Sequence, residues 1–148
     1  MTKTLVKAKK AFRSGAGKGP GGRTTEELLK DGVVVIDKPS GPTSHQVTTW
    51  AKDILGADKA AHGGTLDPRV TGVLPVGFGT SVRAMDVLHY GTKAYVGVMR
   101  MHGNVDRRRL DSVVSEFTDE IFQTPPMRSA VKREQRTRRV HQLRVLEV

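Results

Sequence analysis

The pattern of apolar and polar positions in the first third of the chain predicts a strand followed by a helix. Residues 33–36, Val-Val-Val-Ile, form a β-branched run that ends in the turn-forming residues 39–42, which is typical of a buried strand. The apolar residues that follow, up to Leu55, recur at helical spacing behind Thr43. This spacing predicts a helix that is capped by Thr43 and ends at Gly56.

Shorter patterns predict the other helices. Residues 25–30 can form a helical turn, and residues 81–89 have the composition of a helix. Apolar side chains between residues 110 and 121 again recur at helical spacing, with Asp106 as a suitable cap. The proline pair at 125–126 is expected to stop this helix.

Two further strands are expected, at residues 93–101 and 140–148. In the first of these, Val96 and Val98 favour β-structure. The order strand, helix, loop, helix, strand, helix, strand predicts an α+β or mixed α/β domain, in which a mixed sheet is flanked by helices.

The segment 62–79 is rich in glycine and proline but also carries six apolar side chains or prolines at spaced positions. Surface loops are normally polar, so an apolar loop of this kind is expected to pack against the body of the domain. Loops that a rigid scaffold holds in this way commonly carry function.

The length of 148 residues allows one domain with a real core. Hydrophobic residues make up 36% of the chain and aromatic residues 5%, which is low for a fully compact domain. Residues 14–22 contain five glycines and cannot repay the entropy lost on ordering. We therefore expect a flexible basic arm at residues 1–23 and a folded domain at residues 24–148.

Positive charge is concentrated in three clusters, and the formal net charge is +10. The clusters lie at residues 1–23, at the arginine triplet 107–109 and at residues 128–144. Basic clusters bind phosphate backbones through counterion release. Solubilising surface charge would explain one such cluster, but three of them favour a polyanionic partner, of which RNA and DNA are the commonest.

Several functional classes are excluded or disfavoured. The chain has no cysteine, which excludes disulfides and thiolate metal sites, and its five histidines lack paired metal-ligand spacing. Gly72 and Gly77 have the spacing of a phosphate-binding loop, but Phe78 occupies the lysine position. No metal and no cofactor are expected. The chain also lacks a secretory leader and an apolar run near the roughly 20 residues of a membrane helix, so a soluble, intracellular protein is expected.

Asp67 is the main candidate for chemistry. It precedes Pro68 in the apolar loop, and the glycines around it permit close approach of the backbone to a substrate. Two interpretations are open: Asp67 is a catalytic carboxylate facing a substrate, or its side chain caps a turn, a common use of aspartate before proline.

Four stretches of the sequence together resemble one enzyme family. The central stretch is Gly-Thr-Leu-Asp-Pro at residues 64–68, and the others are residues 37–45, 93–97 and 125–140. In this order they resemble the TruB/dyskerin pseudouridine synthases, and the last stretch resembles the archaeal and eukaryotic, RNA-guided H/ACA branch. The resemblance covers residues 26–148 and implies an incomplete pseudouridine synthase fold.

The resemblance implies isomerisation of uridine to pseudouridine in tRNA or rRNA, on a base lifted out of its stack. Asp67 matches the family's catalytic carboxylate, which either attacks covalently or removes a sugar proton; both routes require it to be ionised. Tyr95 matches the residue that stacks on the target base, against the alternative of a core tyrosine. His62 matches a histidine near the flipped nucleotide, against the alternative of a loop histidine without a special role.

The resemblance also implies the partners. The expected partner is RNA, both as target and as H/ACA guide, together with small H/ACA accessory proteins; no DNA and no membrane partner is expected. The family acts in the cytoplasm, or in the nucleolus of a eukaryote. The basic residues expected to contact the RNA backbone are Arg128, Lys132, Arg133, Arg136, Arg138 and Arg139.

The family's catalytic domains are longer than this chain. The resemblance implies a further strand, whose arginine pairs with the catalytic aspartate, and then a PUA domain. We therefore expect this chain to be a fragment or split subunit, catalytically silent and only marginally stable by itself. Two alternatives stay open: a non-catalytic RNA-binding fragment and a basic ribosome-associated protein, of which the Gly-Thr-Leu-Asp-Pro stretch disfavours the second.

Overall fold

The computed structural model describes residues 18–125, 127 and 134–148. The chain divides into two units, Met1–Ala94 and Tyr95–Val148, and each is described by itself. Of the basic arm predicted at residues 1–23, residues 1–17 lie outside the described residues. Among the described residues, no helix is long and apolar enough to cross a membrane.

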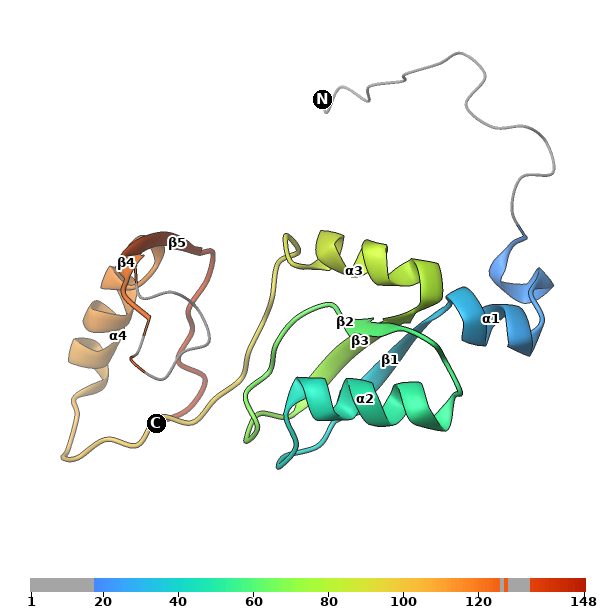
Figure 1. Cartoon of the computed structure of the whole chain (residues 1–148). Helices are drawn as coiled ribbons and strands as arrows, with labels where there is room; N and C mark the ends of the chain where they lie inside the picture. The colour runs from blue at the N-terminus through green and yellow to red at the C-terminus, as the bar shows by residue number, and fades with distance from the viewer. Residues whose placement is uncertain (1–17, 126, 128–133) are drawn as a thin grey trace, which may run out of the picture. The chain divides into compact units, whose positions relative to one another are not determined.

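The first unit is built on a three-stranded sheet. Its strands are β1 (Val33–Lys38), β2 (Ala60–His62) and β3 (Gly72–Phe78), in the order β1-β3-β2, with both pairings antiparallel (Figure 1). Lys38 pairs with Gly72 at one end of β1. The chain therefore leaves β1 and enters β3 at the same end of the sheet.

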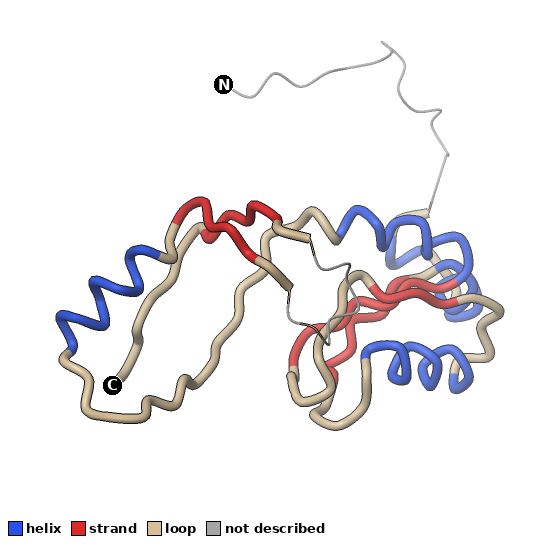
Figure 2. Tube along the Cα trace, turned by 60° about the vertical axis from the view of Figure 1, so that its left-hand side comes forward, coloured by secondary structure: helices blue, strands red, loops and turns tan. Residues whose placement is uncertain are grey.

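Helices cover the two faces of this sheet (Figure 1 and Figure 2). On one face, α2 (Ser44–Ile54) packs its Val47 against Leu74, Val76 and Phe78 of β3, all buried. These three β3 side chains share one face because they are spaced two residues apart.

On the other face lies α3 (Val82–Leu88) with the buried Met85. A Cβ atom at Gly77 of β3 would come within 2.9 Å of the Ser81 carbonyl oxygen, so only glycine allows this close packing.

Local sequence rules explain the start of two helices in the first unit. Thr24 caps α1 (Thr25–Asp31) and Thr43 caps α2, each through a complete capping box with the residue three positions on. The short 3-10 turns η1 (Pro20–Gly22) and η2 (Gly79–Ser81) complete this unit.

The structure corrects two predictions in the first unit. The run 33–36 is a strand, but it is not buried: Val33 is 49% and Val35 65% exposed. Residues 72–78, predicted as part of a loop, form the central strand β3. The loop prediction was wrong because Pro75 normally argues against a central strand. Here its carbonyl accepts from the Gly63 N–H just beyond the end of β2, so its missing donor costs the sheet little.

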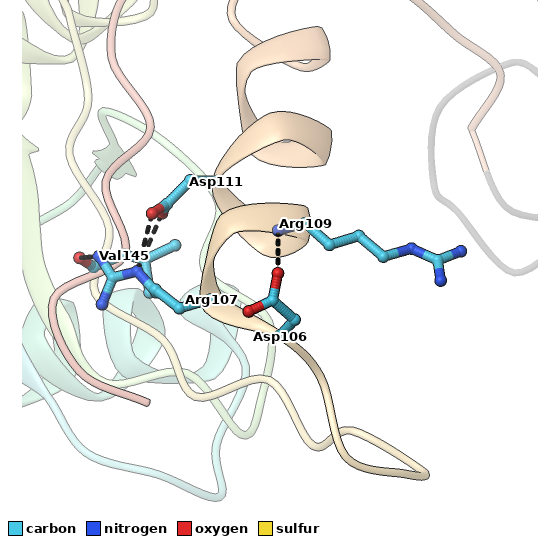
Figure 3. A network of polar contacts seen from close by, with 5 residues as sticks. All are labelled: Asp106, Arg107, Arg109, Asp111 and Val145. Carbon is cyan, nitrogen blue, oxygen red and sulfur yellow. Dashed lines mark hydrogen bonds and ion pairs between the residues drawn. The ribbon is translucent and has the colours of Figure 1, made fainter.

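The second unit contains α4 (Arg107–Glu116) and a two-stranded antiparallel ribbon of β4 (Asp119–Gln123) and β5 (Arg136–Val140). Asp106 caps α4 as predicted, accepting from the Arg109 N–H at 3.2 Å (Figure 3). Arg107, the first residue of the helix, donates to the carboxylate of Asp111 one turn later at 2.9 Å and to the Val145 carbonyl at 3.2 Å. These contacts attach the C-terminal segment to the start of the helix.

Strand predictions were less accurate in the second unit. Residues 93–101 and 141–148 lie outside any strand, and the helix predicted as far as residue 121 ends at Glu116. High β-propensity does not form a strand without a neighbouring strand to bond to, and residues 93–101 have none among the described residues. The α+β class is confirmed; all the strand pairings described are antiparallel, whereas a mixed sheet was predicted.

Candidate functional site

Two connections meet at the end of the sheet where Lys38 pairs with Gly72. The first is the turn at residues 38–44, which links β1 to α2. The second is the loop at residues 63–71, which links β2 to β3 and which we call the Asp67 loop. Backbone atoms of this loop are held by groups of the turn, so the two connections form one polar assembly.

Lys38 is the centre of the assembly. It is the last residue of β1 and is fully buried. Its Nζ donates to the carbonyl oxygens of Pro39 at 2.9 Å, Pro68 at 3.2 Å and Val70 at 2.8 Å. A lysine ammonium has three protons to donate, so these carbonyls use its full capacity. The Lys38 side chain thus holds the part of the loop that follows Asp67.

Ser44 holds the near side of the loop. Its side chain is 1% exposed at the start of α2. The hydroxyl accepts from the Leu66 N–H at 2.9 Å and donates to the Leu66 carbonyl at 3.0 Å. In addition, the Gly41 N–H donates to the Pro68 carbonyl at 2.8 Å, and Gly41 has a φ of +116°, a conformation that glycine tolerates best.

Asp67 lies between these anchors. Its carbonyl accepts from the Val70 N–H at 2.9 Å, which closes a tight turn. Its side chain is exposed and makes no hydrogen bond or ion pair with any described residue. The turn is therefore closed by the main chain rather than by a capping carboxylate, and the carboxylate is available to an external group.

His62 is the last residue of β2 and is half-buried. Burial lowers the pKa of His62 below its ordinary value of 6.5, while the Gly64 backbone opposes this shift. Its Nδ1 is buried and has no hydrogen-bond partner among the described residues. No bond joins His62 to Asp67 within the described part of the unit, so the two residues share a loop region but not a contact network.

Tyr95 and the predicted RNA-contacting arginines belong to the second unit. Tyr95 is 67% exposed in an irregular segment. On β5, Arg138 and Arg139 point to opposite faces, because neighbouring residues of a strand alternate. Arg139 pairs with Asp119 at 3.1 Å, and Arg138 donates to the Thr137 carbonyl at 3.3 Å.

Of the other predicted RNA-contacting residues, only Arg136 belongs to the described part of the chain. Arg136 is the first residue of β5 and is half-buried. The predictions for Arg128, Lys132 and Arg133 fall outside the described residues. Over the described part of the chain, no group of three His, Cys, Asp or Glu side chains could hold a metal ion.

The residue that sequence reasoning missed is Ser44. Its position within the stretch 37–45 was noted, but a serine next to a helix cap is ordinarily explained by the cap itself. Its bonds to Leu66 span 22 positions in the sequence, so no local pattern could reveal them. Lys93 makes local bonds instead: just after α3, its Nζ donates to the carbonyls of His89 and Gly91, both at 3.0 Å.

Two known family domains match successive parts of the chain. The domain described as "DKCLD (NUC011) domain" matches residues 1–48. The domain described as "TruB family pseudouridylate synthase (N terminal domain)" matches residues 52–108, which include the Asp67 loop and Tyr95.

Archaeal proteins are similar over almost the whole chain. A "Probable tRNA pseudouridine synthase B" of Pyrobaculum islandicum is 47% identical over 144 residues, which are 97% of this chain and 44% of the relative. A protein with the same description from Methanothermobacter thermautotrophicus is 50% identical over 129 residues, 87% of this chain and 40% of the relative. The chain thus spans less than half the length of these relatives.

Solved structures show the same fold. A chain of a "Cbf5-Nop10-Gar1 Complex" superposes with a TM-score of 0.77 at 47% identity, covering 89% of this chain and 40% of that one. A chain of an "H/ACA RNP bound to a substrate RNA containing 2'-deoxyuridine" has a TM-score of 0.74 at 40% identity, with coverage of 90% and 41%.

Proposed function

Because the chain belongs to the TruB/dyskerin family of pseudouridine synthases, of which it matches an N-terminal region, we propose that it takes part in converting uridine in RNA to pseudouridine, as the part of the enzyme that carries Asp67. Three kinds of comparison support this: two domain descriptions, archaeal relatives over 87–97% of the chain, and solved structures of the same fold. The activity is that of an isomerase, since the product has the atoms of the substrate, and no cofactor is proposed.

The reaction breaks the bond between N1 of uracil and C1′ of the ribose and forms a bond from C5 to the same carbon. The hydrogen on C5 leaves to solvent, and N1 gains a proton. The enzyme must reach C1′ of the ribose and both N1 and C5 of the base. The target uridine therefore has to leave its stack and enter the site.

The observation that carries the proposal is the state of the Asp67 carboxylate. It is exposed and unpaired among the described residues, yet it stands on a turn that Lys38, Gly41 and Ser44 fix through the backbone on both sides. A reacting group contributes most to the rate when the backbone that carries it is held rigidly and its own lone pairs are free to contact the substrate. In this role Asp67 either attacks the nucleotide covalently or removes a sugar proton.

Tyr95 and His62 are assigned supporting roles. An exposed tyrosine ring can stack on an unstacked base, as aromatic side chains do in single-stranded RNA sites. His62, whose lowered pKa favours the neutral ring near pH 7, can stack against or hydrogen-bond a nucleotide without adding charge beside Asp67.

The RNA backbone is held by arginines and lysines of the second unit: Arg128, Lys132, Arg133, Arg136, Arg138 and Arg139. The neighbours' descriptions name H/ACA particles, a substrate RNA, Nop10 and Gar1. The proposed partners of this chain are accordingly a guide RNA, a target tRNA or rRNA, and small accessory proteins of the same kind. The proposed location is the cytoplasm, or the nucleolus of a eukaryote.

The test is release of tritium from RNA labelled at C5 of uridine. It is run on the 148-residue chain and on a hybrid in which this chain replaces the matching segment of the Pyrobaculum islandicum relative. Asp67→Asn is expected to abolish release in every form that is active, and to leave RNA binding within about twofold because the side chain is nearly isosteric. Asp58→Asn, at an exposed aspartate of the same unit, is the matched control and should keep full activity.

Substantial release by Asp67→Asn would remove Asp67 from the reaction. No release from either wild-type form, with salt-dependent RNA binding retained, would reject catalysis and support the alternative of a non-catalytic RNA-binding protein.

A further inference from the structure

Among the described residues, Ser44 is the one outside the loop whose side chain bonds the Leu66–Asp67 peptide group. We infer that Ser44 is a positioning residue for Asp67: its hydroxyl sets the orientation of the peptide that precedes the reacting carboxylate. The inference rests on the proposed role of Asp67 and extends it to a residue that does not touch the substrate.

The Ser44 hydroxyl bonds the peptide groups on both sides of Leu66. The Ser44 oxygen lies 2.9 Å from the Leu66 nitrogen and 3.0 Å from the Leu66 carbonyl oxygen, so one hydroxyl acts as acceptor and donor for the same residue. The Leu66 carbonyl and the Asp67 nitrogen belong to one planar peptide group. Fixing that carbonyl therefore fixes the plane from which the Asp67 side chain projects.

Ser44 is itself held rigidly. It is the first residue of α2, directly after the Thr43 capping box, and the Thr48 hydroxyl donates to its carbonyl at 2.8 Å. At 1% exposure, its surroundings leave little access for a water molecule that could replace the hydroxyl. A site supported from a helix in this way is more precise than one supported by loop contacts alone.

The two buried side chains that support the loop, Ser44 and Lys38, act on opposite sides of Asp67. Lys38 bonds the carbonyls of Pro68 and Val70, after Asp67, and also Pro39 at the end of its own strand. Ser44 bonds only Leu66 in the loop, before Asp67. Loss of the Ser44 hydroxyl is thus expected to free one side of Asp67 while the other side stays attached and the fold is retained.

The test is Ser44→Ala, with Thr48→Val as the control that removes a neighbouring buried hydroxyl whose bond stays within the helix. In Ser44→Ala the turnover number is expected to fall by about 10²-fold, as for a displacement of roughly 1 Å at a reacting group, with KM little changed. The backbone order parameter of Asp67 is expected to drop from about 0.85 to below about 0.6. Ser44→Cys, with a weaker donor and acceptor, should change both quantities less and serves if the alanine variant does not fold.

Kinetics are measured in the form of the protein that shows Asp67-dependent tritium release, and the order parameter in the 148-residue chain. An unchanged order parameter, an unchanged turnover number, or equal losses in Thr48→Val would each overturn the inference. If wild-type protein releases no tritium, the proposed function fails, and the order parameter of Asp67 alone decides whether Ser44 holds the turn.

Discussion

The two units of the chain use polar side chains in opposite ways. In the first unit, Lys38 and Ser44 are buried and spend their hydrogen bonds on the backbone of the Asp67 loop. In the second unit, the arginines of β5 lie largely at the surface, and Arg139 makes an exposed ion pair with Asp119. The difference agrees with the proposed roles: a carboxylate that must be aimed is held by buried contacts, whereas side chains that bind a polyanion stay accessible to it.

Apolar side chains are also more deeply buried in the first unit than in the second. In the first unit, Leu74, Val76 and Phe78 of the central strand are 0–1% exposed. In the described part of the second unit, Leu110 is the one buried apolar side chain, at 8% exposure. Stability is therefore expected to be concentrated in the unit that carries Asp67.

The sharpest test of this contrast compares two phenylalanines. Phe78→Ala in β3 is expected to lower the free energy of unfolding by about 3–5 kcal/mol, because it leaves a cavity in the core. Phe122→Ala in β4, where the ring is 77% exposed, is expected to cost less than about 0.5 kcal/mol. Urea denaturation followed by circular dichroism measures both, and equal losses would contradict the contrast.

Lys38→Met is expected to have the next largest effect. It preserves the length of the side chain but leaves the carbonyls of Pro39, Pro68 and Val70 without their donor, at a cost of about 2–4 kcal/mol. The control is Lys59→Met, since the Lys59 side chain is exposed and makes no bond to a described residue. Thermal unfolding compares the two variants. A Tm of Lys38→Met equal to that of the control would show that these bonds contribute nothing to stability.

Removing the arginines of β5 is expected to have a smaller effect, which is on RNA affinity and depends on salt. Neutralising Arg136, Arg138 and Arg139 to Gln is expected to reduce the slope of log affinity against log salt by about 2, since each phosphate contact in single-stranded RNA contributes about 0.7. The matched control neutralises Lys30, Lys52 and Lys59 of the first unit, which changes the net charge equally. A filter-binding series in salt measures both; the same slope change in both variants would mean that net charge, not the ribbon, determines RNA affinity.

The smallest effect concerns His62 and pH. Because burial lowers the pKa of His62 in the folded chain, the unfolded chain binds the proton more tightly, and protonation favours unfolding. The stabilising contribution of the neutral ring is complete above pH 6.5 and is lost as the pH falls through the lowered pKa. The charges of His45 and His89 also lower the pKa of His62.

Urea denaturation between about pH 5 and pH 8 can isolate this contribution by comparing wild type with His62→Gln, which does not titrate. The wild type is expected to lose stability relative to the variant on acidification. A difference that does not change with pH would rule out His62 as the titrating group.

Local chemistry in the sequence determined the starts of the helices and the identity of the candidate site. Thr43 and Asp106 cap α2 and α4 as predicted, because a cap acts within one turn of its own helix. The Gly-Thr-Leu-Asp-Pro stretch identified Asp67, and the family that it indicated is the family to which the chain belongs.

Only the tertiary structure decided which segments became strands and what holds Asp67. Residues 72–78 form the central strand despite Pro75, and residues 93–101 form none despite their β-branched valines, because a strand exists only where a neighbour supplies its hydrogen bonds. The bonds from Lys38 and Ser44 to the Asp67 loop likewise join residues 22 to 32 positions apart. The sequence is enough to single out Asp67 as the candidate carboxylate. Its support comes from the meeting of β1, β3 and α2 at one end of the sheet.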